Sequence, residues 1–443
     1  MQPHWVSPAY VGVSPDGKVS YLSDTPPEWP CGIETVNGFA LPGFQNAHSH
    51  AFQFAMAGMA EEHRPGTADD FWTWREAMYR CALSIDPDQL EAIATGLYAE
   101  MLRNGYTHVA EFHYLHHDQK GRHYANMAEM GERLVSAAKT AGIKVTLVPV
   151  FYQQGSFGKA FEPNQKRFIS STTEDYLHLL DDSANAVFAY ADARLGFGVH
   201  SLRAVNHRDI IETFNHGPSK IPFHLHAAEQ EKEVSECRAH LGMRPVEWLL
   251  ENMEVGSRFH IVHCTHMVDD ELSGLAKTGA SVVLCPGTEA NLGDGIFRFT
   301  EFTARGGQWS QGTDSHISLN PLEDLRWLDY TQRLTTHRRN TFDHGASRLV
   351  RGSVTAGRRA MGEYEANDYF EIGKAFDAVV YSGTSPQLLG RTLEHTLATI
   401  LYTADSSCIK GTMVNGNWVV RDQHHTNGES IINAFRKAIE SMR

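Results

Sequence analysis

Two histidines near the start of the chain have the spacing of a metal-binding pair. His48 and His50 stand one residue apart in the run LPGFQNAHSHAF, and residues i and i+2 of a strand project from the same face. Two neutral imidazoles on one face can bind a single metal ion. Because such a pair alone is more typical of ordinary polar residues at a strand end, the metal hypothesis depends on the rest of the chain.

Histidine or aspartate recurs at the ends of later predicted strands. His226 lies near the end of IPFHLHA, His263 near the end of FHIVHC, and Asp314 near the end of QWSQGTDS. Each residue alone has a structural explanation, as a hydrogen-bonded core histidine or a helix cap. Taken together on one rim, His48, His50, His226 and Asp314 predict a site for a metal ion such as Zn²⁺ that keeps a position open for water.

Three residues near this predicted site have the chemistry that hydrolysis needs. A metal lowers the pKa of a bound water toward neutrality and so supplies hydroxide. Glu229 follows His226 by three residues and can protonate a leaving nitrogen, provided that an enclosed site raises its pKa. His263 can orient the hydroxide or the polarised substrate atom, and Asp314 can accept the proton of the water.

Alternating strands and helices must position these residues. From Leu41 onward, eight strand candidates are mostly separated by helical patterns, such as the helix that begins after Asp86 with a proline and a capping-box glutamine. This alternation predicts an α/β fold, a (β/α)8 TIM-type barrel with its chemistry at the C-terminal strand ends. A doubly wound sheet is the alternative, but the chain contains no Gly-x-Gly-x-x-Gly phosphate loop.

Strand patterns at both ends of the chain predict a second, smaller domain. Residues 1–41 hold short strand-like pieces, and strand signals return after residue 365 in FDAVVY and MVNGNWVVR. The simplest arrangement pairs the two sets. We therefore predict a β-sandwich domain built from residues 1–41 and 365–443, and a metal-dependent barrel domain over residues 42–364.

Composition excludes several classes of function. The net charge of −14 over 443 residues, without a long run of lysine or arginine, argues against a nucleic-acid surface. The N-terminus lacks the pattern of a signal peptide, and no apolar run has the length of a membrane span. The six cysteines are scattered without a Cys-x-x-Cys spacing, so neither a disulfide framework nor a thiolate zinc site is indicated. We expect a cytoplasmic protein with a small-molecule substrate.

These residues resemble the mononuclear deaminase branch of the amidohydrolase superfamily, and the resemblance covers nearly the whole chain. More narrowly, the strings SHAFQFAMAG, FWTWREAMY, VAEFHYLHHD and LCPGTEANLGDGIF are similar to N-formimidoyl-L-glutamate deiminases of histidine degradation. Binuclear relatives carry a carboxylated lysine on the fourth strand, where this chain has His200, so one metal ion per subunit is expected. Phe376 and Thr313 depart from the usual alanine and serine of these relatives, and neither is a proposed ligand.

The resemblance implies zinc-dependent hydrolysis of the formimino C–N bond, which gives N-formyl-L-glutamate and ammonia, by a homodimer. It also implies that five residues bind the substrate: Gln53, Arg75, Tyr114, His200 and Arg203. Independently, a dicarboxylate substrate needs cationic partners, and an arginine can pair with a carboxylate through two hydrogen bonds. Surface ion pairing is the usual role of a single arginine, and rim packing is the alternative for Tyr114 and Gln53.

Two other interpretations keep the fold and change the function. The same metal site could deaminate a heterocyclic amine such as a purine, pyrimidine or triazine, although the two arginines argue against it. A non-catalytic barrel scaffold is the second, although the expected metal ligands are all present. The segment FWTWRE, with Phe71, Trp72 and Trp74, predicts a hydrophobic wall, and a lid is its alternative. The loop 285–295 is expected to shape the site without a chemical role.

Overall fold

Eight parallel strands follow one another around a barrel in the computed structural model, which describes residues 5–28, 32–61, 71–343, 345–365, 367 and 369–442. A parallel bridge between Ser49 and Asp314 joins the two ends of this sheet, so the predicted (β/α)8 barrel is confirmed. The barrel strands are β4 (Phe44–Ser49), β5 (Tyr106–His113), β6 (Lys144–Phe151), β8 (Phe197–Ser201), β9 (Phe223–Ala227), β10 (Phe259–His263), β11 (Ser281–Leu284) and β12 (Gln308–Gln311). The short strand β7 (Ala193–Leu195) pairs with β6 beside this path.

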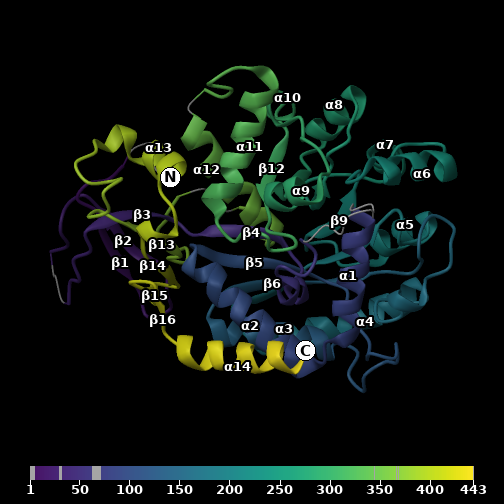
Figure 1. The fold of residues 1–443 in the computed structure, drawn as a ribbon. Helices are drawn as coiled ribbons and strands as arrows, with labels where there is room; N and C mark the ends of the chain where they lie inside the picture. Colours follow the sequence, from purple (N-terminus) through teal and green to yellow (C-terminus); the bar gives the residue numbers. More distant parts are fainter. Residues whose placement is uncertain are drawn as a thin grey trace.

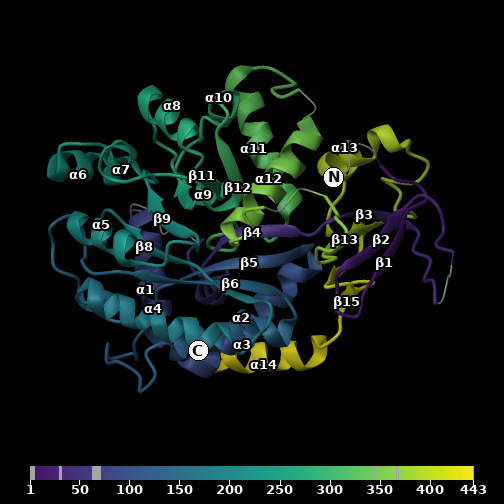
Figure 2. The same cartoon turned by 180° about the vertical axis from the view of Figure 1, so that it is seen from behind.

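Helices surround the barrel in both views (Figures 1 and 2). Helix α2 begins after the predicted cap residue Asp86, whose carboxylate accepts a hydrogen bond from the Gln89 backbone at 2.8 Å. The helices up to the end of the barrel are α1 (Phe71–Ser84), α2 (Pro87–Arg103), α3 (Glu129–Ala141), α4 (Thr173–Val187), α5 (His207–His216), α6 (Glu231–Leu241), α7 (Pro245–Asn252), α8 (Asp269–Thr278), α9 (Pro286–Leu292), α10 (Phe299–Ala304), α11 (Pro321–Thr336) and α12 (Gly345–Ala360). Short 3-10 helices are η1 (Ala51–Met56), η2 (Pro163–Gln165) and η3 (Ser406–Cys408).

A five-stranded sheet combines strands from both ends of the chain, as predicted. Its order is β16 (His424–His425), β15 (Asn417–Arg421), β14 (Ile409–Val414), β13 (Ala378–Ser382) and β3 (Gly38–Pro42), and the hairpin of β1 (Tyr10–Val13) and β2 (Val19–Ser23) is a separate two-stranded sheet. In Figure 1 the purple and yellow strands lie together on one side of the barrel. The domain boundaries near residues 41 and 364 remain predictions.

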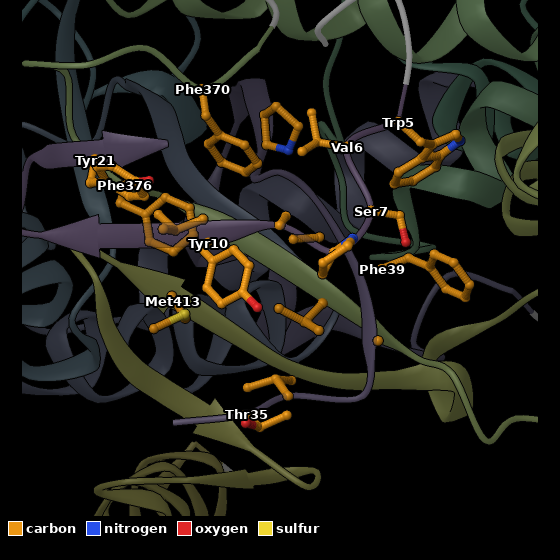
Figure 3. A pocket seen from close by; sticks show the side chains of 18 of the residues that line it. Trp5, Val6, Ser7, Tyr10, Tyr21, Thr35, Phe39, Phe370, Phe376 and Met413 are labelled. Atoms are coloured by element: carbon orange, nitrogen blue, oxygen red, sulfur yellow. The ribbon is translucent and has the colours of Figure 1, made fainter. Parts of the chain in front are cut away.

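Aromatic side chains fill the centre of this smaller region. The ring of Phe376 packs 4.9 Å from the ring of Phe370, and Phe376 is buried in a cluster with Val19 and Ala378. Position 376, where the resemblance leads us to expect alanine, therefore holds a buried aromatic ring. Figure 3 shows a wide hollow beside these residues, also lined by Tyr10 and Phe39, and no predicted site residue lines it.

The chain returns to the barrel through helix α13 (Leu393–Thr403) and ends in helix α14 (Gly428–Ser441). The α14 helix runs along α2 (Figure 1), where the ring of Phe435 lies against Gly96. This contact packs the C-terminal helix against the barrel. Within the described ranges, none of the helices combines the length and the apolar character that crossing a bilayer requires.

Candidate active site

Three imidazoles and one carboxylate converge at the C-terminal ends of the barrel strands. The Nε2 atom of His48 lies 3.1 Å from Nε2 of His50 and 3.0 Å from Nε2 of His226. Asp314 follows β12, and its Oδ1 atom lies 3.3 Å from Nε2 of His50 and 3.6 Å from Nε2 of His48. All four side chains are buried. The four residues predicted as metal ligands, which come from three distant parts of the sequence, thus form one cluster.

The hydrogen bonds behind this cluster define which ring nitrogens carry protons. Nδ1 of His50 donates to the carbonyl of Phe112 at 2.9 Å, and Nδ1 of His226 donates to the carbonyl of His200 at 3.0 Å. In the neutral rings, Nε2 of both histidines is then an unprotonated acceptor. Burial lowers the pKa of both rings, which keeps them neutral. Lone pairs that converge beside a carboxylate fit a bound cation, and backbone carbonyls that hold the opposite nitrogen are the usual outer partners of ligating histidines.

Glu229, His263 and Asp314 form a second group beside the histidines. Nε2 of His263 lies 3.6 Å from Oε1 of Glu229 and 3.7 Å from Oδ2 of Asp314. Burial raises the pKa of Glu229 to about 7, as its predicted role in proton transfer requires. Burial alone would also raise the pKa of Asp314, but a contact with His48 and the charge of His263 outweigh it and hold that pKa below its usual value.

One cavity opens onto both groups. His48 is fully buried and does not line it. All the other predicted site residues do: Gln53, Arg75, Tyr114, His200, Arg203, His50, His226, Glu229, His263 and Asp314. The side-chain amide of Gln53 donates to the hydroxyl of Tyr114 at 3.1 Å. Burial, together with the charge of Arg203, holds the pKa of His200 well below its usual range, so His200 offers a neutral ring.

Helix α1 forms one wall of the cavity. Phe71, Trp74, Arg75, Met78 and Tyr79 all line it, and their spacing of three and four residues places them on one helical face. The guanidinium of Arg75 lies 5.4 Å from the ring of Tyr79. The predicted hydrophobic wall is consistent with this arrangement, whereas the side chain of Trp72 lies outside the described residues. A lid function of the segment remains a prediction.

Buried carboxylates that the sequence pattern does not single out hold this rim in place. The segment 285–295, expected to be a loop that shapes the site, instead contains helix α9 over Pro286–Leu292. Glu289 of this helix accepts hydrogen bonds from Nδ1 of His263 at 3.3 Å and from the backbone of Cys285 at 2.9 Å. Glu233 accepts from the backbone of Glu229 at 3.0 Å. Both glutamates lie in the first turn of a helix, where acidic residues are common for other reasons, so the sequence alone gives no signal of these contacts.

Thr313, where the resemblance leads us to expect serine, makes two contacts through its hydroxyl group. Oγ1 of Thr313 accepts a hydrogen bond from the amide of Asn46 at 2.7 Å and lies 2.9 Å from Nδ1 of His316. A serine hydroxyl could make the same contacts. Threonine at this position is therefore compatible with the contacts that the site makes here.

A closed parallel barrel with three histidines and an aspartate at its C-terminal rim defines a metal-dependent hydrolase architecture. The profile of the amidohydrolase family matches residues 39–419. The chain belongs to the amidohydrolase family, as the sequence resemblance implies.

The chain is also similar to individual proteins of known sequence or structure. Formimidoylglutamate deiminase of Pseudomonas aeruginosa is 43% identical over 91% of this chain and 89% of its own length. The crystal structure of an amidohydrolase from Brucella melitensis superposes with a TM-score of 0.91 at 37% identity, covering 99% of this chain and 96% of that one. An adenosine deaminase from Xanthomonas campestris with bound zinc has a TM-score of 0.81 at 20% identity, covering 100% and 96% of the two chains, and shares the fold.

Proposed function

We propose that the chain hydrolyses N-formimidoyl-L-glutamate to N-formyl-L-glutamate and ammonia in histidine degradation. The observation that carries this proposal is a single cavity that combines a cluster of unprotonated histidine nitrogens with two arginines, Arg75 and Arg203. The first feature suits activation of water, and the second suits a dicarboxylate substrate. The similarity to a deiminase of this name, at 43% identity over most of both chains, supports the same assignment.

His48, His50, His226 and Asp314 would hold one divalent metal ion per subunit, and we propose Zn²⁺. Neutral imidazoles and a carboxylate suit this metal. When bound, the metal supplies Lewis-acid activation of water and of the substrate. The relative from Xanthomonas campestris was crystallised with bound zinc, which supports the choice at the level of the fold.

The proposed reaction adds water to the formimino carbon and breaks the bond from this carbon to the terminal nitrogen. Asp314 accepts a proton from the attacking water, and its low pKa allows it to stay ionised until then. Glu229, with a pKa of about 7, donates a proton to the terminal nitrogen as water adds. When the C–N bond breaks, this nitrogen takes the proton held by Asp314, and Glu229 regains a proton from the new hydroxyl. His263 lies between the two carboxylates and orients the reacting groups. The carbon keeps the water oxygen as the formyl group, and ammonia leaves.

Arg75 and Arg203 bind the two carboxylates of the glutamate part, with Gln53, Tyr114 and His200 as neutral hydrogen-bond partners. Charge-assisted bonds of this kind are among the stronger ones in proteins. We further propose that the enzyme is a cytoplasmic homodimer, which light scattering and cell fractionation would test.

Deamination of a heterocyclic amine remains the alternative, because aromatic side chains also line the cavity: Phe71, Trp74, Tyr79, Tyr114, Tyr152 and Phe168. These rings could stack on a heterocycle, but a heterocyclic amine has no carboxylates with which the two arginines could pair. The deciding experiment measures ammonia release from N-formimidoyl-L-glutamate and from a panel of purines, pyrimidines and triazines, with and without a chelator.

Chelator-sensitive turnover of the formimino compound alone is the expected result. Turnover of a heterocycle alone would overturn the substrate assignment and keep the metal centre. A metal-loaded protein with no activity would favour a non-catalytic scaffold. The Glu229→Gln variant should retain its metal and lose about 10²- to 10⁴-fold in kcat, which separates proton transfer from metal binding.

A further inference from the structure

Glu111 is a buried carboxylate that takes no part in the chemistry proposed above. It lies on β5 and is only 2% exposed. Its Oε1 atom accepts a hydrogen bond from the backbone of Ala51 at 2.6 Å, and its Oε2 atom accepts from the hydroxyls of Ser49 at 2.7 Å and Tyr98 at 3.1 Å. Burial raises the pKa of Glu111 to about 8, and the three donors, which reach both oxygens, offset part of the cost of burying the ionised form.

Two of these three donors belong to the segment that carries the proposed metal ligands. Ser49 is the residue between His48 and His50, and Ala51 directly follows His50. The backbone of Ser49 also bridges to Asp314, the ligand from the far end of the barrel. One carboxylate therefore contacts the chain on both sides of His50 and next to His48.

The backbone pairing between β4 and β5 is irregular at this point. Asn46 pairs with Val109 and Ser49 pairs with Glu111, so the register shifts between Asn46 and Ser49, and His48 lies within the shifted stretch. Such an irregularity re-aims side chains but removes regular ladder hydrogen bonds. The side chain of Glu111 supplies contacts to the segment that the ladder itself lacks.

We propose that Glu111 is a positioning residue that holds the segment from His48 to Ala51 in its metal-binding conformation. The inference rests on the metal centre proposed above and extends it to a residue outside the cavity. Outer partners of metal ligands typically change metal affinity or activity by about 10- to 100-fold when they are removed. Loss of Glu111 is expected to act through the affinity for metal rather than through substrate binding.

Four full-length variants separate this role from ordinary core packing. Glu111→Met keeps an unbranched side chain of similar length and removes both acceptor oxygens. Glu111→Gln keeps one oxygen for the Ala51 backbone and presents its NH2 group to hydroxyls that can rotate and accept. Tyr98→Phe removes a hydrogen bond from the same carboxylate on the helix side, and it leaves the ligand segment untouched. Ser49→Ala removes the hydrogen bond to Glu111 that comes from the residue between the two histidines. This variant takes the place of Glu111→Met if Glu111→Met does not fold.

The measurement is zinc affinity, obtained by equilibrating the zinc-loaded proteins with graded concentrations of a chromophoric chelator. Glu111→Met should weaken zinc binding about 10- to 100-fold, Glu111→Gln should weaken it less, and Tyr98→Phe should match the wild-type protein. Ser49→Ala should also bind zinc more weakly than the wild type. Circular dichroism and thermal unfolding of the chelated proteins report whether each variant is folded.

The inference would be overturned if folded Glu111→Met bound zinc as tightly as the wild-type protein. If Glu111→Met does not fold, the same result in Ser49→Ala would overturn it. Equal losses in Glu111→Met and Tyr98→Phe would also overturn it, because they would assign the effect to packing between β5 and α2. A wild-type protein that binds no zinc would instead remove the proposed metal centre itself, and this inference with it. The two failures are therefore distinguishable.

Discussion

Several residues at the rim of the barrel have backbone conformations that L-amino acids rarely adopt. His263 has a φ angle of 72°, Asp314 of 47° and Ala228 of 54°. Non-glycine residues in this left-handed region are strained, and such strain persists where the surrounding structure holds it. Each of these positions lies within or beside the proposed catalytic group, so its hydrogen-bonded supports bear directly on activity.

We predict that Glu289 matters for catalysis because it holds the ring of His263. Glu289→Ala removes the acceptor for Nδ1 of His263 and should lower kcat about 10- to 100-fold with little change in KM. Glu289→Gln keeps an oxygen that can accept the same bonds and should recover most of the activity. Steady-state kinetics on both variants provide the test, and equal kcat values for Glu289→Ala and wild type would contradict it.

We predict that Arg75→Met and Arg203→Met each lower kcat/KM chiefly through KM. A hydrogen bond to a charged group contributes about 1.5–3 kcal/mol, which corresponds to a loss of about 10- to 150-fold. N-formimidoylglycine, which has only the α-carboxylate, shows which arginine binds which group. Substitution of the arginine that binds the side-chain carboxylate should not change kcat/KM for this shorter substrate. An arginine whose substitution changes kcat/KM for neither substrate does not bind a carboxylate.

At the scale of elements, the contact between α2 and α14 offers a test of packing away from the site. A Cβ atom at Gly96 would lie 2.8 Å from the ring of Phe435. We expect Gly96→Ala to destabilise the protein, because overpacking costs about 1–3 kcal/mol and exceeds the gain of about 1 kcal/mol from helix propensity. In a Phe435→Ala background the same substitution should become stabilising. Chemical denaturation of the double-mutant cycle measures this coupling, and identical effects in both backgrounds would argue against it.

The elements that carry the site could be predicted from the sequence, because each combines an apolar run with a polar residue at its end. The strand before His48 and the strand through His226 are of this kind, and α2 has its own capping signal at Asp86. Contacts between distant segments could not be predicted in the same way. Glu111 and Ser49 meet only because β4 and β5 pair, and Glu289 reaches His263 only across neighbouring strand ends. The sequence pattern likewise does not predict α13, whose burial depends on its contacts with the barrel helices.

At the scale of the whole molecule, several buried histidines outside the proposed ligand set make stability depend on pH. Burial, with the charge of Arg167, lowers the pKa of His113 to about 3, and burial also lowers the pKa of His108, His116 and His260. The unfolded chain binds a proton at each of these positions below about pH 6.5, whereas the folded protein does not. Stability is therefore lost as the pH falls below this value.

We predict that His113→Phe reduces this dependence. Between pH 7 and pH 5 the wild-type protein should lose about 2 kcal/mol more than the variant, because one fewer histidine gains a proton on unfolding. Denaturant unfolding at both pH values measures the difference, and any constant effect of the substitution on stability cancels. An unchanged pH dependence would show that His113 titrates normally in the folded protein.

The single bridge between Ser49 and Asp314, where the barrel closes, has a consequence for the unfolded chain. The proposed metal takes ligands from both sides of this seam, and these ligands are separated by most of the barrel sequence. A bound ion would therefore act as a cross-link that closes a very long loop of the chain. A loop that is already closed leaves the disordered chain with less conformational entropy. Metal-loaded protein would then resist opening at the seam between the first and last strands, and removal of the ion would make that seam the first place where the ring of strands comes apart.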